Sequence, residues 1–220
     1  MKIKKIFHLI PHEGIGGVEV AAKTCPEIHK NNFHFSCKYL SKQKNNSNSF
    51  LKIYSFFEII IHSFNIAFQK PDFLLVSLWK SAFSALLIKL LRPNTKIILF
   101  LHSSKSVNFI DYYLNFFVGE RAHQIWGDSE TTIKTRSEEL KIKKGIKKKI
   151  ISFQCYKLEF NASETYNPNF IYWGRFHKCK NIQLGIKFFY EVSKNIKNTK
   201  FTLIGPDFGE LYKLKKLAHD

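Results

Sequence analysis

Residues 96–102 read KIILFLH, a continuous apolar run that begins at a lysine and ends at a histidine. A strand with one face in water alternates apolar and polar residues, whereas a continuous run is typical of a strand buried on both faces. Such strands lie in parallel sheets that carry helices on each side. The run therefore predicts an interior strand of a parallel α/β sheet. It also predicts that His102 lies at the carboxyl edge, where ligands bind in such folds.

The same kind of run recurs on both sides of this strand, separated by longer segments of helical period. A repeated strand–helix order predicts a doubly wound, Rossmann-like parallel sheet, with right-handed crossovers that place all carboxyl ends on one edge. We expect strands at 3–10, 33–40, 73–77, 96–102, 124–127 and 149–153, and helices at 17–30, 49–70, 79–91, 108–118 and 130–140.

A polar, turn-rich segment interrupts this pattern. Residues 161–168 read NASETYNP, which predicts an interdomain linker. We therefore place a first domain at residues 1–165 and the beginning of a second at 166–220.

The second domain is expected to hold one strand–helix–strand unit and a trailing helix. Two parallel strands cannot bury both faces of a sheet, and a complete doubly wound half takes roughly 100–150 residues. We therefore expect an incomplete Rossmann-like unit with exposed apolar side chains. The expected elements are strands 170–173 and 201–204 and helices 182–196 and 209–218, and the expected exposed residues are Ile171, Leu203 and those of 182–189.

The net charge of +18 comes from 35 basic and 17 acidic residues. Such a field attracts phosphates, anionic lipids and nucleic acid alike. The densest basic run, KIKKGIKKK at 141–149, is either a solvated loop or a patch that contacts anionic lipid together with the apolar helix 49–70. The run contains no aromatic residue, which disfavours binding of single-stranded nucleic acid.

The cysteine pattern bears on metal binding, and the length of the apolar stretches bears on where in the cell the protein is expected. The four cysteines form no CxxC pair and have no zinc-ligand spacing, so we expect reduced thiols and no metal site. No uncharged apolar stretch approaches the ~20 residues that cross a bilayer, and the first apolar stretch is too short for a signal peptide. We expect a cytoplasmic protein, in peripheral contact with the inner face of the membrane if the basic run binds lipid.

A glycine-rich loop, HEGIGGVE at 12–19, follows the first expected strand and opens a helix. Gly14 and Gly16 fit the first two positions of the dinucleotide fingerprint, but Glu19 stands where that fingerprint needs a small residue. No acidic residue follows the second strand, so binding of NAD is not expected. The loop either approaches an anion at the helix N-terminus or is a tight turn without a ligand.

Two histidines receive different interpretations. His102 can donate to a phosphate or sugar oxygen, or it is merely an exposed residue at a strand end. His8 lies within the first strand and is expected to pack there. After the strand at 124–127, Asp128 or Ser129 is a helix cap, which alone would explain both residues.

The most informative stretch is FIYWGRFHKCKN at 170–181. After the strand, Arg175 offers a planar fork of donors for phosphate oxygens, and Lys180 adds a point charge near a helix N-terminus. Together they could stabilise a diphosphate leaving group. Lys178 competes with Lys180 for this role, and a plain basic surface loop is the alternative.

The order Gly174, Arg175, Phe176 and Lys180 resembles the donor-binding motif of the retaining glycosyltransferase family 4, also called glycosyltransferase group 1. Weaker similarities follow in the same order as in that family. Residues 201–207, FTLIGPD, resemble its next strand and glycine loop, Gly16 and Gly17 its N-terminal glycine pair, His102 its mid-domain histidine, and 126–130 a strand-then-serine segment.

This resemblance implies a GT-B fold, with two Rossmann-like domains that face each other across the active site. Arg175 and Lys180, between Gly174 and Gly205, would hold the diphosphate of a nucleotide-sugar donor. Gly16 and Gly17 would approach the donor phosphate and the acceptor, and His102 would contact the transferring sugar.

The implied activity is transfer of the sugar, with retention, to a glycan or lipid-linked acceptor in cell-surface polysaccharide synthesis. Neither a metal nor a further cofactor is implied. The alternative is an inactive or truncated basic α/β module that binds nucleotide or nucleic acid.

Two departures from the family pattern limit the expected activity. Residues 151–156, ISFQCY, lack an Asn-Gly-Val-Asp-like turn, and the chain ends before a pair of glutamates eight residues apart. We therefore expect these 220 residues alone to bind nucleotide weakly without transferring sugar. A truncated product or a missing half supplied by a separate polypeptide would account for the short chain.

Overall fold

The computed structural model describes residues 3–14, 16–25, 27–42, 49–151 and 169–219. For residues 49–52 it describes the backbone alone. The chain divides into two compact units, residues 1–157 and 158–220, and each is described by itself. The linker predicted at 161–168 and the segment 152–156 lie outside the described residues, so the predicted domain boundary stays a prediction.

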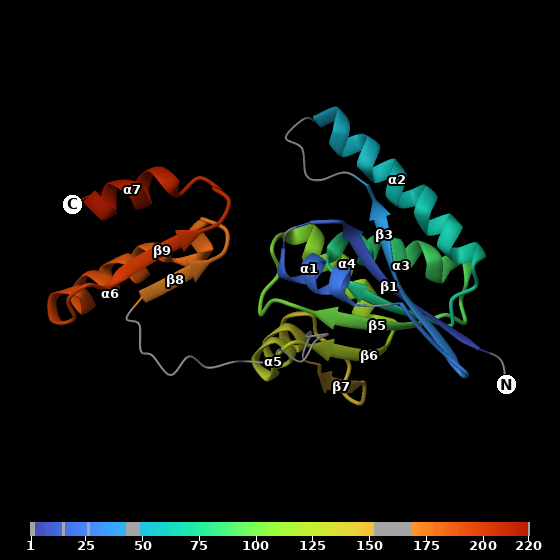
Figure 1. Cartoon of the computed structure of the whole chain (residues 1–220). Coiled ribbons are helices and arrows are strands. Elements are labelled where there is room, and N and C mark those ends of the chain that lie inside the picture. The colour runs from blue at the N-terminus through green and yellow to red at the C-terminus, as the bar shows by residue number, and fades with distance from the viewer. Residues whose placement is uncertain (1–2, 15, 26, 43–48, 152–168, 220) are drawn as a thin grey trace. The chain divides into compact units, whose positions relative to one another are not determined.

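The first unit is built on a seven-stranded sheet (Figure 1). Every pair of neighbouring strands is parallel except the first, in which β2 runs antiparallel to β3. From β1 the chain adds β3 on one side and later β4 on the other, so the topological switch point lies beside β1. The order is β2 (Ile28–Lys30), β3 (Phe33–Ser41), β1 (Lys4–His12), β4 (Phe73–Ser77), β5 (Lys96–Leu101), β6 (Ala122–Gly127) and β7 (Lys147–Ile150).

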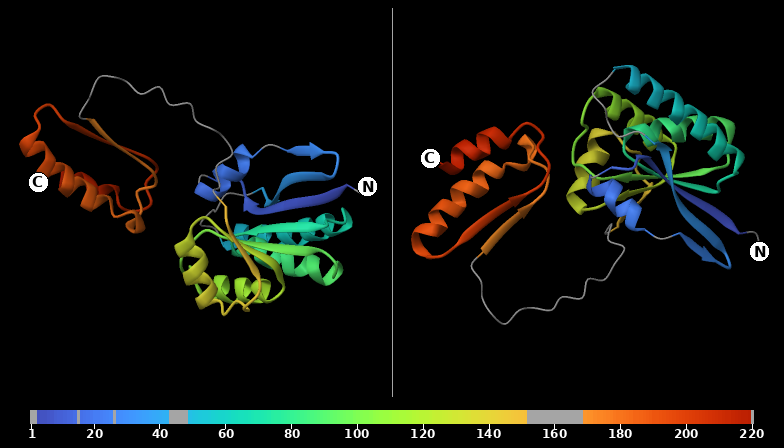
Figure 2. Two further views of the ribbon diagram at one scale, coloured as in Figure 1. Left: turned by 90° about the horizontal axis from the view of Figure 1, so that it is seen from below. Right: turned by 45° about the horizontal axis from the view of Figure 1, so that its top comes forward.

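Helices cover both faces of this sheet, which confirms the doubly wound prediction (Figure 2). Alternation along β1 turns Phe7 and Leu9 towards the main core, where they meet residues of α2 (Ser49–Phe68), α3 (Trp79–Leu91) and α4 (Phe109–Glu120). Leu140, at the end of α5 (Glu130–Glu139), joins the same cluster. The opposite face carries His8 and Cys37 and is covered by α1 (Gly17–Thr24), since the Cys37 thiol donates to the carbonyl of Ala22 at 3.4 Å.

Two predicted elements differ from the structure. The helix expected at 17–30 ends at Thr24, and an unpredicted strand, β2, occupies 28–30. The proline at position 26 disfavours helical backbone at the preceding residue, and Cys25 is extended at φ −78° and ψ 116°. The strand expected at 149–153 begins instead at Lys147, so the second half of the basic run is an exposed edge strand rather than a loop.

The second unit is a pair of parallel strands, β8 (Asn169–Trp173) and β9 (Lys200–Ile204), with α6 (Ile182–Asn195) and α7 (Leu211–His219) packed against it. Its core is formed by Phe176, Ile182 and Leu214. Ile171 is exposed, as predicted, and Trp173 beside it is 84% exposed. The prediction for Leu203 was wrong, because alternation along β9 turns its side chain into this core.

Candidate functional site

Three neighbouring strands place a chain of polar side chains at the carboxyl side of the large sheet. His102 directly follows β5, Ser77 ends β4, and His8 lies in β1. The Ser77 Oγ atom is 2.9 Å from Nε2 of His8 and 2.9 Å from Nε2 of His102. The Nδ1 atom of His102 lies 4.0 Å from Oδ2 of Asp128, which follows β6. His8 is packed within its strand, as predicted.

The two histidines linked through Ser77, His8 and His102, are neutral at physiological pH. Burial, together with a smaller effect of the nearby His102, lowers the pKa of His8 to about 3. Burial also lowers the pKa of His102 to about 4, against a smaller opposing effect of the Asp128 carboxylate. A neutral imidazole carries one donor and one acceptor nitrogen, so the direction of the hydrogen bonds becomes a question of tautomers.

The Asp128 carboxylate favours one direction along the chain. A carboxylate only accepts hydrogen bonds, so the His102 nitrogen that faces it is favoured as Nδ1–H. The Nε2 atom of His102 then accepts from the Ser77 hydroxyl, and Ser77 in turn accepts from Nε2–H of His8. The arrangement fixes the orientation of the His102 ring at the sheet edge, the place expected of a residue that contacts a sugar or phosphate oxygen.

The glycine-rich loop is shaped around the carboxylate of Glu19. Gly16 is the N-cap of α1, and a Cβ at Gly16 would overlap the Glu19 carboxylate, whereas Gly17 has open space around its Cα. Glu19 stands at the third position of the helix, as in a capping box. The N-terminus of α1 at Gly16 therefore lies next to the Glu19 carboxylate, whereas the space beside Gly17 is open to a ligand.

A basic residue that the sequence analysis missed also faces this loop. Lys80 lies in the first turn of α3, and burial lowers its pKa. The pKa of His12 is lowered mainly by burial and to a smaller extent by the charge of Lys80, against the raising effect of Glu19. The signal was present in the sequence, because Lys80 comes three residues after the strand that ends at Ser77. A lysine directly behind a parallel strand lies at the edge where ligands bind.

In the second unit, the ends of β8 and β9 approach each other closely through two glycines. Gly174 donates its N–H to the carbonyl of Ile204 at 2.9 Å, and Phe176 donates to that of Pro206 at 2.9 Å. Gly205 has φ +156°, and a Cβ there would overlap the carbonyl oxygen of Gly174. This close approach requires glycine at position 205.

The clamped strand ends fix the backbone of Arg175. Its side chain is exposed, and the guanidinium carbon lies 5.4 Å from the ring centroid of Phe208. A guanidinium stacked over an aromatic ring still directs its N–H donors outward in its own plane, where they can meet a phosphate. Asp207 anchors the following loop, since its Oδ1 accepts from the backbone N–H groups of Gly209, Glu210 and Leu211, and the bond from Leu211 contributes most to lowering its pKa.

Lys180 lies in a short 3-10 helix, η1 (Lys178–Lys180), just before α6, and is exposed. A hollow of about 240 Å³ near this turn is lined by Lys178 but by neither Arg175 nor Lys180. The structure therefore leaves Lys178 and Lys180 as alternatives for the second phosphate contact.

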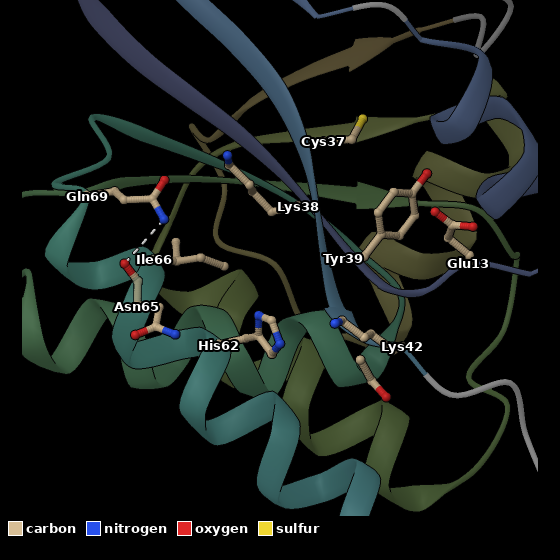
Figure 3. A pocket seen from close by; sticks show the side chains of 10 residues that line it. Glu13, Cys37, Lys38, Tyr39, Lys42, His62, Asn65, Ile66 and Gln69 are labelled. Atoms are coloured by element: carbon tan, nitrogen blue, oxygen red, sulfur yellow. Dashed lines mark hydrogen bonds between the residues drawn. The ribbon is translucent and has the colours of Figure 1, made fainter.

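A larger pocket, of about 340 Å³, lies between β3 and α2 (Figure 3). It contains none of the site residues predicted from the sequence. The side chains that surround it are mostly polar or basic and come from β3, α2 and the glycine-rich loop: Glu13, Cys37, Lys38, Tyr39, Ser41, Lys42, His62, Asn65, Ile66 and Gln69.

Comparison with known proteins places the fold. No known sequence family and no curated protein sequence matches the chain. Among solved structures, the MnaA–UDP complex of Staphylococcus aureus superposes with a TM-score of 0.60 at 15% identity, covering 99% of this chain and 65% of that one. A Listeria monocytogenes protein assigned as a UDP-N-acetylglucosamine 2-epimerase gives a TM-score of 0.53 at 12% identity, covering 99% and 66%.

The chain therefore has the Rossmann-like architecture of GT-B proteins, as the fold prediction required. It spans slightly less than two thirds of the length of these two structures. At such low identity the likeness concerns the fold and not a particular family. Among the helices within the described ranges, none is both long and apolar enough to cross a membrane.

Proposed function

We propose that the chain binds the diphosphate of a nucleotide-sugar and belongs to a GT-B enzyme that transfers the sugar. The observation that carries this proposal is the glycine clamp between β8 and β9, which fixes Arg175 at the carboxyl edge of parallel strands. Parallel α/β sheets bind ligands at this edge, and a guanidinium matches the geometry of phosphate oxygens. The named similar structures, one of them in complex with UDP, support the same ligand class.

The proposed reaction assigns a role to each candidate residue. Arg175, with Lys180 or Lys178, neutralises the diphosphate as the bond from the sugar C1 to its oxygen breaks. An acceptor hydroxyl forms the new bond to C1, with retention, and passes its proton to the departing diphosphate oxygen. His102 contacts the transferring sugar, and Gly17 lets the first-unit loop approach the donor. The acceptor class is a glycan or lipid-linked sugar of the cell surface.

Nucleotide binding is the first property to measure, because the chain covers only part of the similar structures. UDP should bind the 220-residue chain and compete with a UDP-sugar, whereas a single-stranded oligonucleotide at moderate salt should not compete. Tight oligonucleotide binding with no response to UDP would replace the proposal with a nucleic-acid-binding module. Conversion of the donor to an isomeric nucleotide-sugar without any acceptor would replace transfer with epimerisation.

Replacing Arg175 with alanine should weaken UDP binding about 10- to 100-fold, since hydrogen bonds to charged groups contribute about 1.5–3 kcal/mol. Isothermal titration calorimetry measures the change. Lys194→Ala is the matched control, because Lys194 is an exposed cation of the same unit that pairs with Glu191 at 2.8 Å. Equal affinities of Arg175→Ala and the control would remove Arg175 from the site.

We also propose peripheral contact with anionic lipid, centred on the basic run at 141–149. Helix α2 packs on β3 and α3, while the basic run starts next to α4, where Lys143 pairs with Glu120 at 3.5 Å. Helix α4 carries exposed apolar side chains in the turns before Glu120, with Tyr113 55% and Phe117 44% exposed. Apolar and basic signals together are what stable peripheral binding requires.

The triple variant Lys147→Gln/Lys148→Gln/Lys149→Gln should bind anionic vesicles at least about 10-fold more weakly, since each lysine near the surface contributes about 1 kcal/mol. Vesicle flotation at low and high salt gives the measurement. The control removes three exposed lysines of the second unit, Lys194, Lys200 and Lys213. Equal binding to neutral and anionic vesicles would exclude the lipid contact.

A further inference from the structure

The antiparallel edge of the large sheet brings together Glu27, His29 and His34, outside the residues of the proposed donor site. We propose that these three side chains form a binding site for a divalent cation of the later first-row transition metals, with Zn²⁺ as the representative ion. The proposal is independent of nucleotide-sugar binding. It also departs from the sequence analysis, which predicted no metal site.

The three potential ligand atoms already converge. All lie within 4.8 Å of one another. One carboxylate oxygen, Oε1 of Glu27, is 2.5 Å from Nε2 of His34 and 3.6 Å from Nε2 of His29. The two imidazole rings stack, with centroids 4.2 Å apart and planes 12° apart. Both Nε2 atoms therefore face the same small volume beside the carboxylate.

Backbone geometry produces this convergence. His29 and His34 are direct partners in the antiparallel β2–β3 ladder, and side chains directly opposite each other in such a ladder are neighbours. Glu27 comes two residues before His29, and side chains two apart along an extended chain point to the same face. The helix expected at 17–30 would have turned Glu27 and His29 apart. The site depends on the helix ending at Thr24.

The ligand set selects the class of metal. Two imidazoles and one carboxylate suit Zn²⁺, Ni²⁺ and Cu²⁺, whereas Mg²⁺ and Ca²⁺ prefer oxygen ligands alone. Around a tetrahedral Zn²⁺, ligand atoms are about 3.3 Å apart, given bond lengths of about 2.0–2.1 Å. The two nitrogen–oxygen distances of this cluster, 2.5 and 3.6 Å, lie on either side of that spacing, so the two imidazole rings would rotate to coordinate the ion.

Exposure and charge determine how tightly the site should bind a metal ion. Glu27 and His29 are exposed, so water completes the coordination. The positive charge of Lys38 acts on Glu27 and opposes a second cation, as does the net charge of +18. We therefore expect micromolar affinity. A bound ion would link β2 to β3 and fix the short edge strand in place.

The test uses the whole chain after removal of metals with a chelator. Titration calorimetry with Zn²⁺ at pH 7.5 should show one site, and Co²⁺ should give a visible absorption band. The variants His29→Ala, His34→Ala and Glu27→Gln should each weaken Zn²⁺ binding at least about 10-fold, because each removes one of three ligands. Mg²⁺ should not compete.

Two controls separate this site from other histidines and thiols. His123→Ala removes an exposed histidine of β6, and Cys179→Ser removes a thiol that lies 2.9 Å from Nδ1 of His177. Both should bind Zn²⁺ as the unaltered chain does. The proposal is overturned if the unaltered chain fails to bind Zn²⁺, or if His29→Ala and Glu27→Gln, folded by circular dichroism, bind it undiminished.

Discussion

Replacing Arg136 with methionine should destabilise the first unit by about 3–5 kcal/mol, because it leaves a buried carboxylate without its cation. Arg136 is 2% exposed. Its Nη2 atom lies 3.2 Å from Oδ2 of Asp111, and its Nη1 atom lies 2.6 Å from Oε2 of Glu139. Asp111 is itself 5% exposed, so water cannot replace the lost partner.

The same network fixes the segment that follows His102. Asp111 accepts from the N–H of Val107 at 3.0 Å, Glu139 accepts from the N–H of Ser106 at 3.1 Å, and Arg136 also donates to the Ser106 hydroxyl. Loss of Arg136 should therefore loosen residues 103–108 as well as weaken the contact between α4 and α5. UDP binding through Arg175 should be unchanged while the protein remains folded.

Urea unfolding followed by the fluorescence of Trp79 and Trp126 measures this cost. Arg121→Met is the matched control, since Arg121 is exposed at the end of α4 and donates to the Phe117 carbonyl at 2.9 Å. Its effect should stay within about 0.5 kcal/mol. The double variant Arg136→Met/Asp111→Asn should recover part of the loss, because it removes the unpaired charge. A cost for Arg136→Met no larger than that of the control would refute the prediction.

The fold was predictable from the sequence wherever burial leaves a strong pattern. The run at 96–102 is buried from Ile97 to Leu101 and forms an interior strand of the sheet, as expected. Strand β2 left no such pattern, because it has three residues at the sheet edge and none of them is buried. The sequence at 17–30 was assigned to one helix although the proline at position 26 marks its end.

The candidate site was predictable only where its residues lie next to strand ends. His102 and Arg175 are such residues. Ser77 was missed because its role depends on register, which pairs it with Phe100 and places His8 opposite Leu75 on the neighbouring strand. The sequence around Arg136 gives no sign of its burial, since its partner Asp111 is 25 residues away. Contacts between distant segments carry no local signature.

Acidification from pH 6.5 to pH 5 should destabilise the first unit by about 3 kcal/mol, through the two buried histidines His8 and His102 that Ser77 links. Their pKa values are about 3 and about 4 in the folded protein, against the ordinary value of 6.5. Below pH 6.5 the unfolded chain therefore binds protons that the folded chain does not. Stability then rises with pH, with a slope that is about half of 1.4 kcal/mol per pH unit for each histidine at pH 6.5 and approaches that value as the pH falls to 5.

This pH window separates the histidines from the carboxylates. Glu139 has a pKa below its ordinary value of 4.5, with the hydrogen bond from Arg136 as the main lowering cause against burial. Its stabilisation is present above its unfolded pKa and is lost only as the pH falls below about 4.5. Between pH 6.5 and 5 the slope should therefore come mainly from His8 and His102, with a smaller contribution from His12, whose pKa burial also lowers.

The measurement is urea unfolding at several pH values from 5 to 7.5, for the unaltered chain and for His8→Gln/His102→Gln. A glutamine keeps a donor and an acceptor near Ser77 but does not titrate, so the double variant should lose stability at pH 7 and show a much flatter slope. His123→Gln removes an exposed histidine and should keep the full slope. If the double variant does not fold, the ring-proton NMR titration of the unaltered chain decides. Titration of His8 and His102 near pH 6.5 in the folded protein would show that their pKa values are not lowered. An unchanged pH dependence of stability in the double variant would show that these two histidines do not cause it.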